Sequence, residues 1–410
     1  MGCVGGVSEG QGQQGCGRSG RGVDRRVRTG SRQEPVPDLE SYVVGKLLPT
    51  SGQSGGNSQS WRDGRAGARG ADRGGSGRAD GGQDVSGAKS RTIFHPDSYG
   101  YRPKKSALDA VGTCRQRCWR ADWVIDLDIK AFFDSVPWDL ILKAVEHHTD
   151  QRWILLYVRR WLTAPIQQPD GVLVERDRGT PQGSAISPLL ANLFMHYAFD
   201  AWMVREFPSI PFERYCDDVV VHCGSERQAR MVRDAIAARL AQVGLEMHPD
   251  KTRIVYCKDA DRRDTHEVTS FTFLGYTFRP RLAKNKWGKH FVSFLPAVSR
   301  DVVVAMGREI RSWHIARRSD KSLDDLARMF NSIVQGWINY YGRFYKSMLY
   351  PLLRRLNRHL VRWACRKYKR LKRRERRAMH WLAEVASRAP GLFAHWRFGL
   401  RPDGWAMGAG

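Results

Sequence analysis

The 410-residue sequence has no long apolar run, and none reaches the roughly 18 residues that a membrane-spanning helix requires. Its first residues lack the apolar core of a secretion signal and the Ser or Thr at position six that myristoylation needs. A secreted, membrane-spanning or lipid-anchored protein is therefore not expected. We predict a soluble protein of the cell interior that makes no membrane contact.

Cysteine and acidic residues are also scarce. The eight Cys show no paired metal-binding spacing, which argues against a disulfide scaffold or a zinc site. Cys114 and Cys118 have no downstream partner pair, so we interpret them as neighbours on one helix. Lys and Arg number 68 against 42 Asp and Glu, which gives a formal charge of +26. That excess predicts a polyanionic partner, most simply nucleic acid.

Two of the carboxylates stand side by side, at Asp217 and Asp218. Aromatic and β-branched residues flank them, over 212–215 and 219–221, and favour extended strands. We therefore predict a hairpin whose tight turn, residues 215–218, holds both carboxylates at its tip. An isolated Asp-Asp turn is usually solvated surface, so its meaning depends on what the chain places nearby.

A second carboxylate cluster lies upstream, in residues 123–136. A period of two places Asp126 and Asp128 on one face of a strand with Val124, whereas the opposite face is apolar: Trp123, Ile125, Leu127 and Ile129. Burial of the apolar face leaves Asp128 at the strand end, where the hairpin tip can meet it. Converging carboxylates repel one another and normally need cations between them. Two divalent metals about 4 Å apart can clamp the oxygens of a phosphoryl transfer, and Mg²⁺ suits carboxylate ligands.

Between the two clusters, residues 178–194 open with a Gly-Thr-Pro-Gln-Gly turn and continue into an apolar run that begins a helix. Such a turn before a helix is a generic loop in most proteins. In this order, however, the three blocks resemble the palm motifs of reverse transcriptases, specifically those encoded by bacterial group II introns. Two later stretches also resemble the family: residues 244–252, the next palm motif, and residues 271–278, the hairpin that grips the primer.

The resemblance implies a role for individual residues. The catalytic carboxylates would be Asp128, Asp217 and Asp218, and these three, with the carbonyl of Ile129, would hold two Mg²⁺ ions, with Mn²⁺ as a substitute. Phe133 falls where the family has the aromatic that excludes a ribose 2′-hydroxyl, and simple core packing is its alternative. The remaining nucleotide and template contacts would come from Gln182, Gly183 and Lys251.

Helical spacing is expected over five stretches around the central hairpin: 106–120, 138–148, 152–163, 185–205 and 226–243. Asp170-Gly171 is expected to form a hairpin turn. Strands alternating with helices around an antiparallel hairpin indicate an α+β fold. We predict a right-hand polymerase palm with partial fingers over residues 93–295, followed by an α-helical basic thumb and maturase domain over residues 296–410.

The carboxyl-terminal region is strongly basic. Between Lys346 and Arg377 there are fourteen Lys and Arg and one acid, Glu375. A solvated charged helix is the alternative reading, but the interleaved aromatics offer stacking surfaces for RNA bases. The region resembles the maturase-type thumb that grips intron RNA, and no pattern of the endonuclease domain found in some members follows it. The expected RNA-binding residues are Arg354, Arg355, Arg358, Arg362, Arg366, Lys367, Lys369 and Arg370.

Residues 1–92 differ from the remainder. Of the 40 Gly, 23 lie in the first 90 residues, a composition typical of a disordered basic tail. The family has folded fingers here. Codons can be chosen for this segment so that, when one nucleotide is dropped, the neighbouring frame encodes family-like sequence. This holds for three successive stretches: 47–59, 69–80 and 84–92. We therefore hypothesise that this segment is translated in a shifted frame, with the normal frame resuming by residue 93 and a genuine disordered tail as the alternative.

The implied function is RNA-directed DNA polymerase and intron maturase, acting in the splicing and mobility of a group II intron. The implied partners are group II intron RNA, a DNA target and primer, and deoxynucleoside triphosphates. A homodimer is compatible with this reading, and the implied location is the bacterial cytoplasm, in association with the nucleoid. The alternative is a polymerase-inactive RNA-binding remnant, because the fingers motifs are lost.

Overall fold

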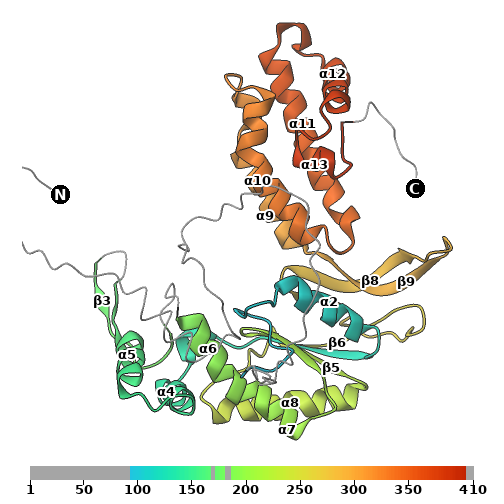
Figure 1. Cartoon of the computed structure of the whole chain (residues 1–410). Coiled ribbons are helices and arrows are strands. Elements are labelled where there is room, and N and C mark those ends of the chain that lie inside the picture. Colours follow the sequence, from blue (N-terminus) through green and yellow to red (C-terminus); the bar gives the residue numbers. More distant parts are fainter. Residues whose placement is uncertain (1–92, 168–170, 181–185, 403–410) are drawn as a thin grey trace, which may run out of the picture.

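The computed structural model describes residues 93–167, 171–180 and 186–402. A mixed palm carries a helical domain that stands above it in Figure 1. Within these described ranges, no helix is both long and apolar enough to cross a membrane. The frame hypothesis for residues 1–92 falls outside the described residues, as do Gln182 and Gly183.

A four-stranded antiparallel sheet, in the order β4-β5-β1-β6, forms the centre of the palm. The strands are β1 (Trp123–Leu127), β4 (Phe212–Tyr215), β5 (Asp218–Cys223) and β6 (Arg253–Tyr256). Leu127 pairs with Val219, so the chain after β1 arrives beside the start of β5. The predicted strand and the predicted hairpin are therefore confirmed, and they are neighbours.

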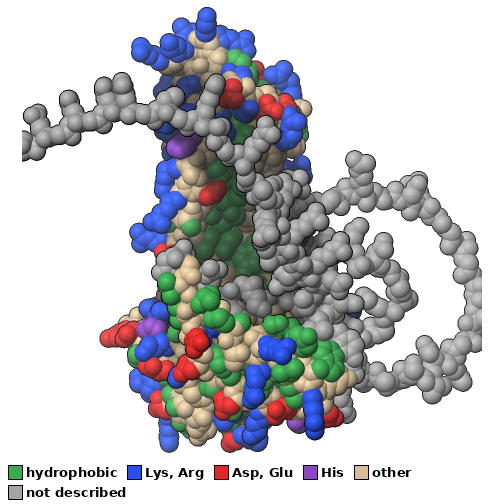
Figure 2. All heavy atoms as spheres, turned by 90° about the vertical axis from the view of Figure 1, so that its left-hand side faces the viewer, with side chains coloured by type: hydrophobic (Ala, Val, Ile, Leu, Met, Phe, Trp, Pro, Cys, Tyr) green, Lys and Arg blue, Asp and Glu red, His purple; other side chains and the backbone are tan. Residues whose placement is uncertain are grey.

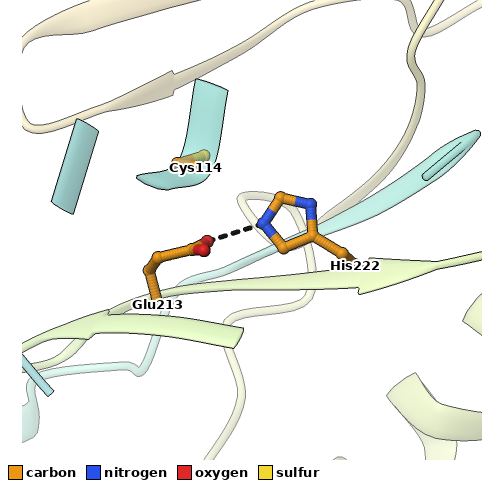
Figure 3. Close-up of side chains that lie close together, drawn as sticks. All are labelled: Cys114, Glu213 and His222. Atoms are coloured by element: carbon orange, nitrogen blue, oxygen red, sulfur yellow. Dashed lines mark hydrogen bonds and ion pairs between the residues drawn. The ribbon is translucent and has the colours of Figure 1, made fainter. Parts of the chain in front are cut away.

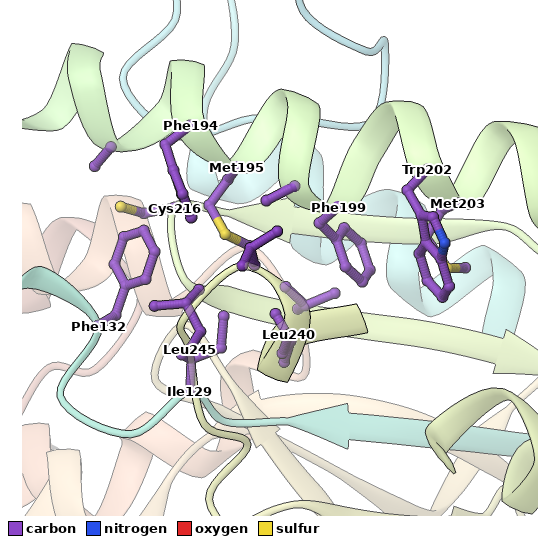
Figure 4. Packing of buried hydrophobic residues seen from close by; sticks show 14 of the residues in the cluster. Ile129, Phe132, Phe194, Met195, Phe199, Trp202, Met203, Cys216, Leu240 and Leu245 are labelled. Carbon is purple, nitrogen blue, oxygen red and sulfur yellow. The ribbon is translucent and has the colours of Figure 1, made fainter. Parts of the chain in front are cut away.

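Helices cover the face of the sheet to which Ile125 and Val221 contribute. They are α4 (Trp138–Glu146), α5 (Arg152–Thr163), α6 (Ser187–Met195), η1 (His196–Asp200), α7 (Ala201–Glu206) and α8 (Glu226–Gln242). The helix predicted over 185–205 is continuous but contains a π-helical turn, η1. Figure 4 shows Phe199 and Met195 from this helix packed over Leu240 and Leu245.

The opposite face of the sheet is covered as well, which the sequence did not predict. Helix α2 (Ala107–Cys118) and a three-stranded sheet pack on Val124 and Val220. This sheet consists of β7 (Phe271–Phe273), β8 (Tyr276–Lys284) and β9 (His290–Val298). Val124 has no exposed surface, so both faces of β1 are covered, and Asp126 is the one residue of the strand that keeps partial exposure.

Three short elements complete the palm: α3 (Phe132–Ser135), β2 (Ile166–Gln167) and β3 (Leu173–Val174). Ile166 pairs with Val174, in agreement with a hairpin around the predicted turn. Asp170 itself lies outside the described residues, whereas Gly171 has the positive φ of +88° that suits glycine.

The helical domain has its own hydrophobic core. Its elements are α9 (Arg300–Ser312), η2 (Ile315–Arg317), α10 (Leu323–Tyr341), η3 (Lys346–Leu349), α11 (Tyr350–Lys367), η4 (Lys369–Leu371), α12 (Glu375–Arg388) and α13 (Ala394–Arg397). A capping box between Ser322 and Asp325 starts α10. The boundary expected at 295/296 falls inside β9, so the change of architecture comes later, after Val298.

Candidate active site and nucleic-acid interface

The Asp217 carboxylate stands on a two-residue hairpin loop. Tyr215 pairs with Asp218, which leaves only Cys216 and Asp217 in the connection. Cys216 adopts a φ of +61°, the left-handed conformation that two-residue hairpins favour at their first central position. The turn therefore projects Asp217 beyond the sheet, while Asp218 remains the first residue of β5.

A fully buried arginine supports this loop from below. Arg214 donates from Nε and Nη2 to the two carboxylate oxygens of Asp200, at 2.7 Å each. Its remaining hydrogens reach Asn192 Oδ1 at 2.7 Å, the Cys216 carbonyl at 2.9 Å and Ser98 Oγ at 2.9 Å. All five guanidinium hydrogens thus have acceptors, and one acceptor belongs to the loop itself.

The stretch before α2 contacts the same loop. Residues 97–99 run parallel to β4, with Tyr99 N donating to the Arg214 carbonyl at 2.8 Å. A Cβ on Gly100 would lie 2.7 Å from Cys216 N, so only glycine allows this approach. Asn192 Nδ2 donates to the Gly100 carbonyl at 2.5 Å. The remaining fingers segment and the palm helix therefore hold the loop together.

Asp128 follows the end of β1 and rests on the loop that precedes β6. Its backbone carbonyl accepts from His248 N at 2.8 Å and from Thr252 Oγ1 at 3.3 Å. Ile129 forms a bridge with Met247, but the bonds of that bridge belong to the residues on either side. The Ile129 carbonyl takes no part in the bridge. The Asp128 carboxylate lies 3.7 Å from Lys251 Nζ.

The carboxylates influence one another electrostatically. Burial, followed by the charges of Asp217 and Asp128, raises the pKa of Asp218 to about 6. Burial also raises the pKa of Asp217, and Asp128 adds to this shift. Asp126, on the covered face of β1, has a pKa raised to about 7 by burial and by Asp218. The structure thus gathers negative charge where the sequence predicted it, and a cation there would stabilise the ionised forms.

Phe133 lies on α3, just after Asp128 in the chain. It is half-buried, and its ring packs at 5.2 Å from that of Phe132. Its carbonyl accepts from Thr180 N at 2.7 Å, and a Cβ on Gly179 would lie 2.7 Å from that carbonyl oxygen. The start of the Gly-Thr-Pro-Gln-Gly loop therefore lies against Phe133, while Gln182 and Gly183 are outside the described residues.

The predicted primer-grip hairpin corresponds to β7 and β8. Its turn is Leu274-Gly275, and both residues have positive φ. Tyr340 of α10 donates to the Leu274 carbonyl at 3.0 Å, and Tyr276 donates to the Tyr340 carbonyl. These bonds connect the hairpin to the helical domain.

The basic helix α11 is amphipathic. Leu356, Leu360 and Trp363 are buried in the domain core. Seven of the eight predicted RNA-binding side chains are exposed on α11 and η4: Arg354, Arg355, Arg358, Arg362, Arg366, Lys369 and Arg370. Lys367 differs, because its Nζ donates to the carbonyls of Ser319 and Lys321. Figure 2 shows Lys and Arg side chains gathered over the helical domain on one face.

Sequence reasoning missed the support beneath the site. Glu213 and Arg214 are adjacent charges inside a short strand, which obliges them to point to opposite sides of the sheet. That pattern could have indicated two buried polar networks. The partners of Arg214 are Asp200 and Asn192, which lie 14 and 22 residues before it in an apolar helix, and no spacing rule connects them to it.

An antiparallel palm sheet with carboxylates at a hairpin tip and at the end of the neighbouring strand defines a right-hand polymerase fold of the reverse transcriptase type. Residues 84–278 match the family described as reverse transcriptase (RNA-dependent DNA polymerase), and residues 303–381 match the group II intron, maturase-specific domain. The chain belongs to the group II intron-encoded reverse transcriptases that carry a maturase domain.

Individual relatives share part of their length with the chain. Protein YkfC of Escherichia coli K12 is 29% identical over 222 residues, which cover 45% of this chain and 55% of YkfC. The group II intron-encoded protein LtrA of Lactococcus lactis is 28% identical over 331 residues, 61% of this chain and 53% of LtrA. The chain thus spans about half the length of these relatives. Telomerase from Candida albicans is a similar solved structure, with 11% identity, a TM-score of 0.39, and coverage of 74% of this chain and 53% of that one.

Proposed function

We propose that this chain copies RNA into DNA and that it assists the folding, splicing and mobility of a group II intron. The convergence of Asp128, Asp217 and Asp218 at one edge of the palm sheet carries the catalytic part of the proposal. Family membership supports the reaction class, and the +26 formal charge supports a nucleic-acid substrate.

The carboxylates fit a pair of divalent cations. Their oxygens are hard ligands, and burial, followed by repulsion from the neighbouring carboxylates, raises the pKa of Asp217 and Asp218. Such a set suits Mg²⁺, with Mn²⁺ as a substitute. The metal ligands would be the three aspartates and the Ile129 carbonyl. Bound there, the two ions supply charge stabilisation to the attacking and leaving oxygens.

The surrounding residues position the other reactants. Lys251 would contact the phosphates of a deoxynucleoside triphosphate, and its position 3.7 Å from Asp128 supports this role. Phe133, on α3 shortly after Asp128, would exclude a 2′-hydroxyl by its bulk. Gln182 and Gly183 would lie under the templating base pair. The β7-β8 hairpin would hold the DNA primer.

The helical domain would bind the intron RNA. Its exposed arginines on α11 present charge to phosphates, whereas the buried Leu face fixes the helix to the core. We assign the palm and remaining fingers to residues 93–298 and the thumb and maturase domain to the residues after them. A homodimer and a location at the bacterial nucleoid are compatible with this assignment.

The test is primer extension on an RNA template with Mg²⁺, using the full chain and its Asp128→Asn variant. We expect synthesis by the parent and its loss in Asp128→Asn, while the exposed Asp139→Asn control keeps activity. A second preparation with residues 1–92 encoded in the neighbouring frame separates two outcomes. Activity only in that preparation would mean that the chain as written is an RNA-binding remnant. Inactivity of both would contradict the polymerase assignment.

A further inference from the structure

A buried cluster of metal-ligating side chains lies on the far side of β4 and β5 from Asp200, and the polymerase reaction does not use it. Cys114 of α2, Glu213 of β4 and His222 of β5 each offer a ligand atom, and the three atoms lie within 4.8 Å of one another. All three residues are fully buried. Figure 3 shows Cys114 above the Glu213 carboxylate, which points to the His222 ring.

Further thiols surround these three residues. Cys118, one helical turn after Cys114, and Cys257, which follows β6, are electrostatic neighbours of this cluster. Cys118 and Cys257 are both buried and free of disulfides. Burial raises the pKa of Cys114 and Cys118 to about 12, so both thiols are protonated unless a cation replaces the proton.

The Glu213 carboxylate has one oxygen held by an outer hydrogen bond and the other turned toward the cluster, as in carboxylates that bind metals. Glu213 Oε1 accepts from Arg117 Nη1 at 2.6 Å, and Arg117 is held in turn by Asp97 at 2.8 Å. Oε2 remains for the interior of the cluster, where it lies 2.6 Å from His222 Nε2. Outer hydrogen bonds of this kind orient ligands in metal sites.

We propose that this cluster is a structural Zn²⁺ site. Cys114 Sγ, Glu213 Oε2 and His222 Nε2 already lie together as three ligands, and Cys118 Sγ, one helical turn along α2, turns toward the ion as the fourth. A site that mixes thiolate, imidazole and carboxylate suits zinc, and four protein ligands leave no open position for catalysis. Two thiolates and a carboxylate give the bound ion a local charge of −1, and Arg117, which also binds Asp97, is the cation beside it. Binding releases the protons of both thiols and the proton shared by His222 and Glu213.

The site would join elements that are far apart in sequence. It ties α2 to β4 and β5, the two strands that carry the Cys216-Asp217 loop. In the competing, metal-free state, a proton lies between His222 and Glu213. Burial lowers the pKa of His222, but the charge of Glu213 has the larger effect and raises this pKa to about 10. The two states differ in metal content and in the state of the thiols, both of which can be measured without polymerase activity.

The experiment measures zinc in the purified full chain after dialysis against a weak chelator, in buffer without Mg²⁺. We expect about one zinc ion per chain, as closed four-ligand sites retain their metal. Replacement by Co²⁺ should produce a thiolate-to-metal charge-transfer band. The double variant Cys114→Ser/Cys118→Ser and the variant His222→Gln should lose both signals.

Cys223→Ser is the matched control, because Cys223 is also a buried β5 thiol but packs on the other face of the sheet. It should keep zinc and the Co²⁺ band. If the ligand variants fail to fold, the parental protein still decides the matter, since zinc removal should increase the reactivity of its thiols. Substoichiometric zinc with no charge-transfer band in the parental protein would overturn the proposal and leave the cluster as an ion pair.

Discussion

Arg214 donates two parallel hydrogen bonds to Asp200, each 2.7 Å long, in the buried layer beneath the catalytic hairpin. Neither side chain has exposed surface, so the pair is fully withdrawn from water. A third bond from Arg214 reaches the Cys216 carbonyl, and this contact makes the pair part of the loop that positions Asp217. We therefore regard Arg214 as a positioning residue.

Removing one partner of this pair should be costly. Arg214→Gln leaves the Asp200 charge buried with only His196, 3.7 Å away, as an ionisable partner. We expect a loss of about 3–5 kcal/mol in the free energy of unfolding. Urea denaturation measures it. The double variant Arg214→Met/Asp200→Leu removes both charges and should lose less. Equal losses in the single and double variants would show that the ion pair is not the source.

Asp217→Asn should lower the rate of DNA synthesis by several orders of magnitude, because the metals supply most of the charge stabilisation. Primer extension measures the rate, and filter binding should show that RNA affinity is nearly unchanged. Asp234→Asn, on the exposed side of α8, serves as the control. Polymerase activity retained in Asp217→Asn would remove Asp217 from the ligand set.

Phe133→Ala should admit ribonucleotides, because the ring excludes the extra hydroxyl by its bulk rather than by a hydrogen bond. The measurement is incorporation of ribonucleotides relative to deoxyribonucleotides. Phe133→Leu keeps most of the volume and should discriminate better than Phe133→Ala. An unchanged preference in Phe133→Ala, accompanied only by lower stability, would make Phe133 a packing residue.

The basic face of α11 should dominate the salt dependence of RNA binding. A surface with six to ten phosphate contacts loses about 10³–10⁵ in affinity between 50 and 200 mM salt, by analogy with duplex binding. Reversal of three exposed residues, Arg358, Arg362 and Arg366, to Glu should flatten the slope measured by filter binding and impair splicing. Synthesis on a short primer-template should be less affected.

A control with the same charge change places Glu at three exposed palm arginines, Arg205, Arg227 and Arg230. Its salt slope should stay closer to that of the parent. Parental slopes in both triple variants would mean that the α11 face is merely solvated.

His395 should make the protein less stable in acid. Its ring is buried against Asn357, and burial lowers its pKa to about 3. Between this pKa and 6.5 the unfolded chain binds one more proton than the folded chain, so stability falls as the pH falls below 6.5. The expected slope is about 1.4 kcal/mol per pH unit from this residue. Denaturant unfolding from pH 7 to pH 5 should show a shallower fall in His395→Gln, whereas His380→Gln, on the exposed face of α12, should behave as the parent.

Local pattern was sufficient for the strand before Asp128 and for the hairpin at Asp217, because alternation and β-branching determine both. Gly336 lies inside α10 (Leu323–Tyr341) without ending it. No neighbouring atom lies within 4 Å of the place where a Gly336 side chain would stand, so the missing side chain costs no packing. Burial of Ile338, two residues later, holds the next turn of the helix against the core. The coverage of Val124 could not be predicted from β1 alone, since α2 and the second sheet provide it. Residues such as Arg214 display their charge in the sequence but not their partners.

The parallel contact of residues 97–99 with β4 also protects the molecule from self-association. β4 is the outer strand of its sheet, and an uncovered outer strand presents unpaired backbone groups to any other extended chain. Here the N–H and carbonyl of Arg214 are satisfied by Asp97 and Tyr99. Detachment of residues 97–99 would expose the unpaired backbone groups of β4 to other extended chains. It would also remove Ser98 Oγ as a hydrogen-bond acceptor of Arg214. Aggregation and loss of the catalytic geometry are therefore two results of one local opening.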